Sequence, residues 1–296
     1  MNSYYAIIIS GGHNGLVTAH ETMKTAIKQR PFLFFLIFTF AISFITGFPT
    51  VFVPGKFEGL SYLSNFGPAI GALIVVGFAE GSDGIKGFVR SLFQWRVNFV
   101  WYLVVLLGPA LTMVTAVLLY NMFGGSGSVP NLNDWISILP QHLLVILSLF
   151  LFMMVGIWGE EIGWRGFALP KLQEKYHPLL ASLIVGAVWA IWHLPLFFIE
   201  DSPQAQMGMT YFFLATLGYS ILYTWIYNGS KESLFMIWLL HSANNATVSY
   251  TMLFFKPLTN EPVFSLAVLG LFDALVILFT KFNLLYQREA YVGKSI

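Results

Sequence analysis

The sequence contains no cysteine among its 296 residues. This absence excludes structural disulfides, thiolate metal sites and a cysteine nucleophile. Any chemistry that the chain performs must therefore come from Ser, Thr, Tyr, His, Asp, Glu or Lys side chains.

Charge is also scarce in this sequence. Charged residues make up 10 % of the chain, whereas they make up about 25 % of soluble domains. The formal net charge is +1, and no stretch is basic enough to indicate a nucleic-acid partner. Hydrophobic residues reach 57 %. We therefore expect an integral, multi-pass membrane protein that is surrounded by membrane lipids.

Apolar runs long enough to cross a bilayer follow one another along nearly the whole chain. They are continuous rather than alternating, which favours helices over a β-barrel. The sequence therefore predicts an all-α membrane bundle of about eight transmembrane helices. The expected spans are residues 31–53, 60–79, 98–122, 137–159, 178–199, 210–228, 233–254 and 263–284. They form one transmembrane domain, 31–285, between an N-terminal tail, 1–30, and a C-terminal tail, 286–296.

Basic residues lie mainly on one side of this arrangement. Thirteen of the fifteen Lys and Arg residues fall in the N-terminal tail, in the connections after the second, fourth and sixth spans, and at the C-terminal end from Lys281 onward. Only Lys56 and Lys256 fall on the opposite side. Because Lys and Arg are retained on the cytoplasmic face, we expect both termini in the cytoplasm and the protein in the cell membrane.

Three shorter segments carry local signals. The first 22 residues lack the features of a signal peptide, and Met23 begins a more ordinary start, MKTAIKQRPFLFFL, so Met23 is an alternative natural start to Met1. The Gly- and Ser-rich segment 124–134 predicts a flexible loop on the external side. The GxxxG spacing at Gly67 and Gly71 would permit two helices to approach closely.

The stretch WGEEIGWRG, residues 158–166, places three charges directly after an apolar run. Ionisable side chains inside a span cost roughly 2.5–3.5 kcal/mol at its centre and are commonly functional. If the fourth helix continues to Leu169, Glu161 and Arg165 lie four residues apart and can pair. Glu160 then points about 100° away from them and stays unpaired. The alternative is that all three are ordinary charges at the cytoplasmic boundary.

Two further spans carry polar pairs at a spacing of one helical turn. Trp189 and His193 share a face of the fifth span, and His241 and Asn245 share a face of the seventh. Taken separately, these side chains suit structural roles, including hydrogen bonds between helices. Taken together with Glu160, they supply a carboxylate base for water, an imidazole to hold that water, and paired donors for an oxyanion. This joint interpretation predicts a hydrolytic site inside the bundle.

The same residues resemble three signatures of one family. EEIGWR matches EExxxR, Trp189 to His193 matches (F/W)xxxH, and His241 to Asn245 matches HxxxN, in the family's order. The chain thus resembles the CPBP family of intramembrane proteases, which is named for CaaX-protein and bacteriocin processing and is also called the Abi family. The motifs cover about residues 137–250, while the first three spans match only by layout.

The resemblance implies a role for each residue of the site. Glu160 would activate water, and His193 would help to position it. His241 and Asn245 would form the oxyanion hole.

The resemblance also implies the reaction. Glu161 and Arg165 would be supporting members of the EExxxR motif. The expected activity is hydrolysis of a peptide bond in a membrane-associated protein or peptide, which is prenylated in the CaaX case. Nothing in the sequence itself encodes a preference for a prenyl group.

No cofactor is favoured, but zinc is an alternative. Glu160, His193 and His241 would make a His2Glu set with one position open for water. Asn245 is a poor zinc ligand and a good oxyanion donor, and the sequence contains no HExxH. We therefore favour a metal-free mechanism.

Three competing interpretations are weaker. A rhomboid-like serine protease would use the GGSG string at 124–127, but this string lies in a polar loop. A presenilin-like aspartyl protease needs two intramembrane aspartates, and only Asp273 is available. A non-catalytic membrane binding or transport protein would use the buried Glu and His side chains as a relay, and it would have no need of an oxyanion hole.

Overall fold

The fold is a bundle of helices. The computed structural model describes residues 21–53, 56–125, 132–200, 202–254 and 262–287, and every regular element in these ranges is helical. The all-α prediction is therefore confirmed. Residues 21–29, inside the expected N-terminal tail, are helical as well. The alternative starts at Met1 and Met23 and the loop at 124–134 concern residues that lie largely outside the described ranges.

Each expected span corresponds to a helix among the described residues. In the part of the chain that the structure describes, six helices are long and apolar enough to cross a membrane. These helices are α2 (Pro31–Phe52), α4 (Gly67–Ser91), α5 (Phe99–Met122), α6 (Leu132–Gly163), α8 (Pro178–Trp192) and α10 (Met209–Gly229). The remaining two spans are α11 (Leu234–Phe254) and the shorter apolar α13 (Val263–Phe279). Short helical segments join them: α3 (Glu58–Ser61), α7 (Leu169–Gln173) and α9 (Pro203–Met207).

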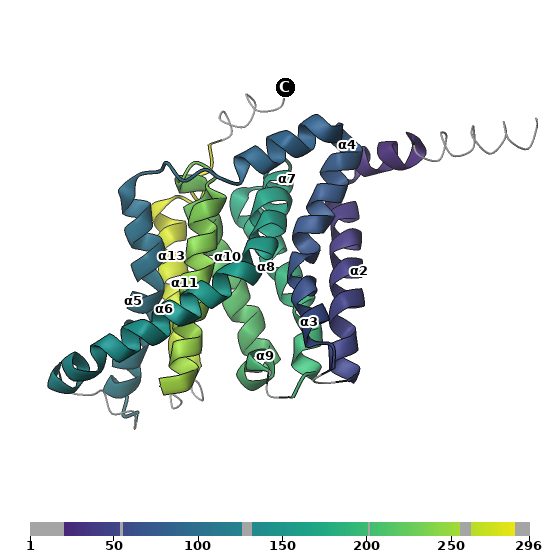
Figure 1. The fold of residues 1–296 in the computed structure, drawn as a ribbon. Helices are drawn as coiled ribbons and strands as arrows, with labels where there is room; N and C mark the ends of the chain where they lie inside the picture. The colour runs from purple at the N-terminus through teal and green to yellow at the C-terminus, as the bar shows by residue number, and fades with distance from the viewer. Residues whose placement is uncertain (1–20, 54–55, 126–131, 201, 255–261, 288–296) are drawn as a thin grey trace, which may run out of the picture.

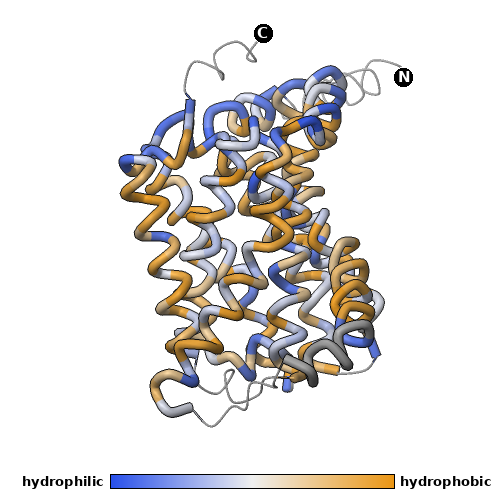
Figure 2. The backbone as a smooth tube through the Cα atoms, turned by 90° about the vertical axis from the view of Figure 1, so that its left-hand side faces the viewer, coloured by the Kyte–Doolittle hydropathy of each residue, from blue (hydrophilic) through white to orange (hydrophobic). Residues whose placement is uncertain are grey.

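The helix α6 runs obliquely across the bundle (Figure 1), and it packs mainly against α11 and α4. The helices α2 and α4 lie at one edge, and α5 and α13 lie toward the other. Figure 2 shows hydrophilic residues gathered at one end of the bundle and hydrophobic stretches along its length. The helix at 21–29 and the segment after α13 both lie at that end. The two described ends of the chain thus lie at the same end of the bundle, which agrees with an even number of spans.

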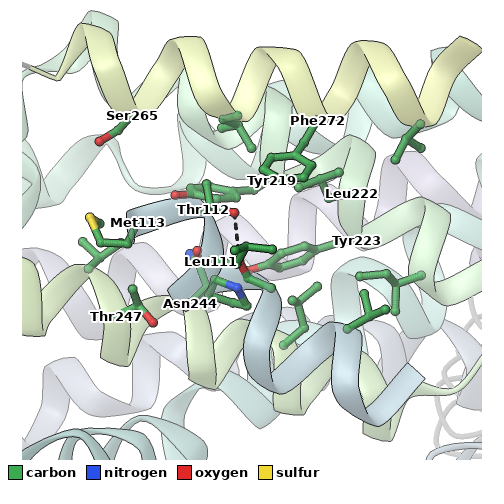
Figure 3. Close-up of a pocket in the computed structure, with 18 of the residues that line it drawn as sticks. Leu111, Thr112, Met113, Tyr219, Leu222, Tyr223, Asn244, Thr247, Ser265 and Phe272 are labelled. Carbon is green, nitrogen blue, oxygen red and sulfur yellow. Dashed lines mark hydrogen bonds between the residues drawn. The ribbon is translucent and has the colours of Figure 1, made fainter. Parts of the chain in front are cut away.

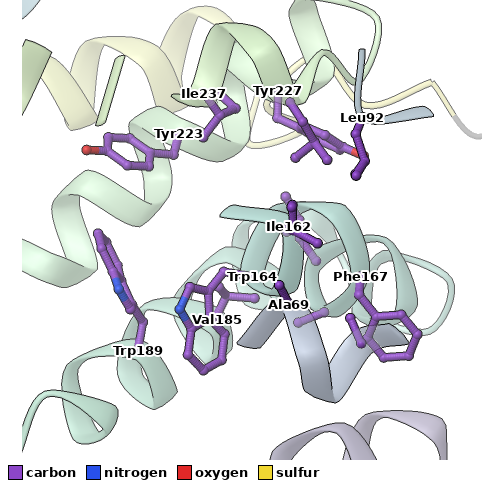
Figure 4. Close-up of a cluster of buried hydrophobic side chains, with 14 of the residues drawn as sticks. Ala69, Leu92, Ile162, Trp164, Phe167, Val185, Trp189, Tyr223, Tyr227 and Ile237 are labelled. Carbon is purple, nitrogen blue, oxygen red and sulfur yellow. The ribbon is translucent and has the colours of Figure 1, made fainter. Parts of the chain in front are cut away.

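The buried core lies where α4, α6, α8, α10 and α11 meet. Figure 4 shows part of it, including Trp164, Val185 and Ile237. Many apolar side chains outside this core face outward, among them Leu118 on α5 and Leu147 on α6. An exposed apolar surface of this kind is expected for a protein whose solvent is lipid.

The GxxxG prediction is confirmed at the contact between α2 and α4. A Cβ atom added at Gly71 would lie 2.6 Å from Oγ1 and 3.0 Å from the backbone nitrogen of Thr39. A Cβ atom at Gly67 would overlap the hydroxyl of Ser43. Only glycine therefore allows these two helices to pack at this distance.

The fourth membrane helix continues past its expected end through a wide turn. Residues Trp164–Ala168 form a π-helix, and the backbone N–H of Leu169 donates to the carbonyl of Trp164. Pro170 follows immediately and has no N–H to donate, so regular α-helical bonding is interrupted here. Such π turns are frequent at functional sites, and this one lies directly after Glu160 and Glu161.

We expect Gly163→Ala to destabilise the bundle by about 1–3 kcal/mol, the usual cost of overpacking. A Cβ atom at Gly163 would lie 2.3 Å from Cβ and 2.5 Å from the carbonyl carbon of Pro68, so the α4 backbone would have to move. Gly270→Ala on α13 is the matched control, because its Cβ atom would meet nothing within 4 Å. Thermal unfolding of both purified variants in one detergent measures the difference. An equal Tm for the two variants would contradict this packing.

Candidate active site

The ion pair between Glu161 and Arg165 lies at the centre of a buried polar cluster. Arg165 Nη1 lies 3.0 Å from Oε1 and 3.2 Å from Oε2 of Glu161, and both side chains are fully buried. The pairing predicted from their spacing is confirmed. Glu160 is also buried, at 7 % exposed, and burial of all three side chains argues against the alternative in which they are ordinary charges at the cytoplasmic boundary.

Two aromatic rings enclose the guanidinium of Arg165. Its Cζ atom lies 4.5 Å from the ring centre of Trp189 and 4.7 Å from that of Tyr223. Figure 4 shows these two rings near one another, on α8 and α10. A desolvated cation over an aromatic face gains about 2 kcal/mol. These contacts offset part of the cost of burying the charge.

His241 brings α11 to the same ion pair. Its Nδ1 lies 2.7 Å from Glu161 Oε1. Because the carboxylate paired with Arg165 can only accept, Nδ1 carries the hydrogen and donates it. Any contact between this imidazole and a substrate must therefore be made by Nε2.

Glu160 has a different environment from its neighbour. The indole Nε1 of Trp189 donates to Glu160 Oε2 over 2.9 Å. Within the described part of the chain, Glu160 forms no ion pair. The sequence therefore predicted correctly that Glu160 lacks a cation partner, but it did not predict the hydrogen bond from Trp189.

His193 ends α8 and is held by the backbone of the preceding turn. Its Nδ1 lies 2.8 Å from the carbonyl oxygen of Trp189. Since a carbonyl only accepts, Nδ1 is the protonated nitrogen, and Nε2 of the neutral ring is a hydrogen-bond acceptor. The imidazole packs against the ring of Phe212, with ring centres 5.0 Å apart.

Asn245 lies one turn beyond His241 on α11 and is half-buried. Its neighbour Asn244 is buried and hydrogen-bonds with Tyr219. The two asparagines thus differ in environment, and Asn245 is the more accessible of the two.

Trp189 is the side chain that joins the predicted site residues. It hydrogen-bonds Glu160, stacks on Arg165, and its ring centre lies 5.7 Å from that of His193 and 5.2 Å from that of His241. The shared face of Trp189 and His193 was visible in the sequence as a four-residue spacing. Nothing in the sequence indicated Tyr223, which is one of many aromatic residues in an apolar span.

The proposed zinc ligands do not fit a metal site. Among the described residues, no three His, Asp or Glu side chains form a group that could hold a metal ion. We therefore derive no step through a metal.

Of the residues on which the competing protease interpretations depend, the structure describes Asp273. The GGSG string at 124–127 lies partly outside the described residues. Asp273 is buried on α13, and its Oδ2 would lie 2.7 Å from a Cβ atom at Gly218 on α10. Asp273 therefore packs between α13 and α10.

Comparison with known proteins gives two matches. The family described as "Type II CAAX prenyl endopeptidase Rce1-like" matches residues 141–247. A protein of Methanococcus maripaludis named "CAAX prenyl protease 2" is 27 % identical over 276 residues, which cover 88 % of this chain and 97 % of the relative. The predicted relationship to the CPBP family is thereby confirmed. The chain is accordingly a multi-pass membrane protein and a peptide hydrolase that is similar to the CPBP proteases.

The match to the CPBP family covers the whole candidate site. Residues 141–247 include all three signatures, from Glu160 to Asn245. The similarity to the archaeal relative extends to the first three spans as well, which the sequence motifs alone did not cover.

We expect Arg165→Ala to lower the free energy of unfolding by about 3–5 kcal/mol, because it leaves the Glu161 carboxylate buried without a cation. Replacing both partners, as Glu161→Gln with Arg165→Met, should cost less than Arg165→Ala alone. Thermal unfolding in detergent measures both losses.

Lys86→Ala is the control for this experiment. Its partner Asp83 is exposed, and exposed pairs contribute about 0–1 kcal/mol. If the double variant were as unstable as Arg165→Ala, charge compensation would not be the role of Arg165.

Proposed function

We propose that this chain is a CaaX-type intramembrane endopeptidase that cleaves a prenylated, membrane-associated protein. The family match and the name of the archaeal relative support this substrate class. We also propose that Glu160, His193, His241 and Asn245 carry the reaction, with Glu161 and Arg165 in support.

The environment of Glu160 is the main support for its proposed role as the base. This carboxylate is 7 % exposed, forms no ion pair among the described residues and accepts one hydrogen bond from Trp189. A carboxylate neutralised by a cation is a poor base, whereas one that is held but not neutralised can accept a proton from water. Glu161, by contrast, forms an ion pair with Arg165 and a close contact with the imidazole of His241.

The reaction begins with a water molecule between Glu160 and the scissile carbonyl. Glu160 takes a proton from this water while the oxygen attacks the carbonyl carbon. His193 holds the water through Nε2, which is an acceptor because Nδ1 donates to the Trp189 carbonyl. Glu160 then returns the proton to the leaving nitrogen as the C–N bond breaks, so the step is balanced.

Two donors stabilise the oxyanion that forms on the carbonyl oxygen. Asn245 supplies its amide N–H, and His241 supplies Nε2–H when its ring is doubly protonated. The Glu161 carboxylate, 2.7 Å from Nδ1, balances the charge of that imidazolium. One removed oxyanion donor typically costs about 10²–10³ in kcat.

We expect Glu160→Gln to reduce cleavage of a prenylated peptide by at least about 10³-fold, because the base is lost while an oxygen remains for Trp189 to bond. Release of a fluorescent C-terminal fragment, measured with purified protein in bilayer nanodiscs, gives the rate. Glu174→Gln is the control, since Glu174 pairs with Lys171 near the surface.

Normal cleavage by Glu160→Gln would show that Glu160 is not the base. Absence of cleavage in the wild-type protein, with every tested peptide, would favour the non-catalytic binding or transport alternative. Adding a chelator to the wild-type reaction tests the metal-free mechanism, which predicts an unchanged rate.

We further propose that both ends of the chain face the cytoplasm in the plasma membrane. The basic residues of the sequence support this orientation. Arg165 is buried and is therefore left out of the count of basic residues on the cytoplasmic side. The excess of Lys and Arg on that side remains without Arg165.

The absence of cysteine allows a direct topology experiment. Ser91 is the last residue of α4 and Met122 is the last residue of α5, so the two flank the third span, and both are exposed. A membrane-impermeant maleimide should label Met122→Cys but not Ser91→Cys in intact cells, and it should label both after permeabilisation. Labelling of Ser91→Cys alone in intact cells would reverse the orientation.

A further inference from the structure

A cavity of about 580 Å³ lies among α5, α10, α11 and α13. Its walls are mostly apolar, and they include Leu103, Leu107, Leu222 and Phe272. On α10 the lining residues extend from Tyr211 to Ile226, which is about 22 Å of helix at 1.5 Å per residue. An extended hydrocarbon chain fits a space of this shape.

This cavity adjoins the candidate active site. Tyr223 lines it and also contacts the site, with its ring centre 4.7 Å from Arg165 Cζ and 5.5 Å from the His241 ring centre. Leu240 and Asn244, which also line the cavity, lie on α11 on either side of His241. Tyr223 therefore forms a wall between the cavity and the cluster around Trp189.

Polar groups occupy only part of the cavity wall. Figure 3 shows Tyr219, Tyr223 and Asn244 around its middle, while Leu222 and Phe272 lie to one side. The hydroxyl of Tyr223 is buried and has no hydrogen-bond partner within the described part of the chain. A buried hydroxyl without a partner costs about 1–3 kcal/mol, so this group is suited to receive a polar atom of a bound molecule.

We propose that this cavity holds the isoprenoid chain of the substrate, with the attached peptide passing Tyr223 toward Glu160. The inference rests on the proposed function, because that function supplies a prenylated substrate. Because the isoprenoid of a membrane-associated substrate otherwise lies among lipid tails, its preference for the cavity comes from van der Waals packing against the walls rather than from leaving water. The cavity thus selects prenylated substrates through binding, separately from the groups that perform hydrolysis.

Gly108 allows the cavity to be filled from one side. It lines the cavity on α5, and a Cβ atom added to it would meet nothing within 4 Å. Gly270 on α13 is the matched control, since its Cβ atom would also meet nothing and it does not line the cavity. Both changes to Phe replace a helix-destabilising glycine, so both variants should fold.

The first measurement is the KM for a farnesylated peptide and for the same peptide without the farnesyl group. Gly108→Phe should reduce the preference of the wild-type protein for the farnesylated peptide by about tenfold or more, a change of 1.4 kcal/mol. Gly270→Phe should keep that preference. An unchanged preference in Gly108→Phe would overturn the proposal.

The second measurement does not require cleavage. A peptide with a photoreactive farnesyl chain is bound to Glu160→Gln in nanodiscs and cross-linked, and the labelled residues are found by mass spectrometry. The proposal predicts labels on cavity-lining residues of α5, α10 or α13, and loss of these labels in Gly108→Phe.

The second measurement separates the two proposals. Labels at other positions would overturn the cavity assignment. Equal labelling of the cavity by a photoreactive phospholipid would also overturn it, because the cavity would then be a site for membrane lipid. If the cavity is labelled but the wild-type protein cleaves no peptide, the proposed function fails while the binding site stands.

Discussion

The structure of the site depends on burying one ion pair. A guanidinium and a carboxylate without solvent each need further partners. For Glu161 and Arg165 these partners come from three other helices: His241 on α11, Trp189 on α8 and Tyr223 on α10. The requirement to satisfy this pair therefore brings four helices together. Glu160, one residue away, accepts a hydrogen bond from Trp189 and forms no ion pair with any described residue.

Sequence patterns predicted the helices well because lipid imposes one dominant constraint. Continuous apolar runs identified every span, and the four-residue spacing of Glu161 and Arg165 predicted their contact. The π turn at Trp164–Ala168 was not predicted, although Pro170 was its local signal. Such turns depend on the bonding of one particular residue rather than on a periodic pattern.

Contacts between helices were harder to predict. Spacing placed Trp189 and His193 on one face, but it could not show that the indole reaches Glu160, which lies 29 residues earlier. The sequence likewise gave no reason to choose His241 as the partner of Glu161 rather than of Glu160. These pairings depend on how tilted helices pack against one another, and a single sequence does not reveal that packing. Tyr223 is the clearest example, since its importance comes only from the rings and charges around it.

The central claim is that hydrolysis occurs where Glu160, His241 and Asn245 face a bound peptide. A structure of Glu160→Gln with a prenylated peptide tests this claim most directly. The account predicts that the scissile carbonyl oxygen lies within about 3 Å of Asn245 and of His241 Nε2, and that its carbon faces residue 160. A peptide bound with its scissile bond away from these three residues would contradict the account.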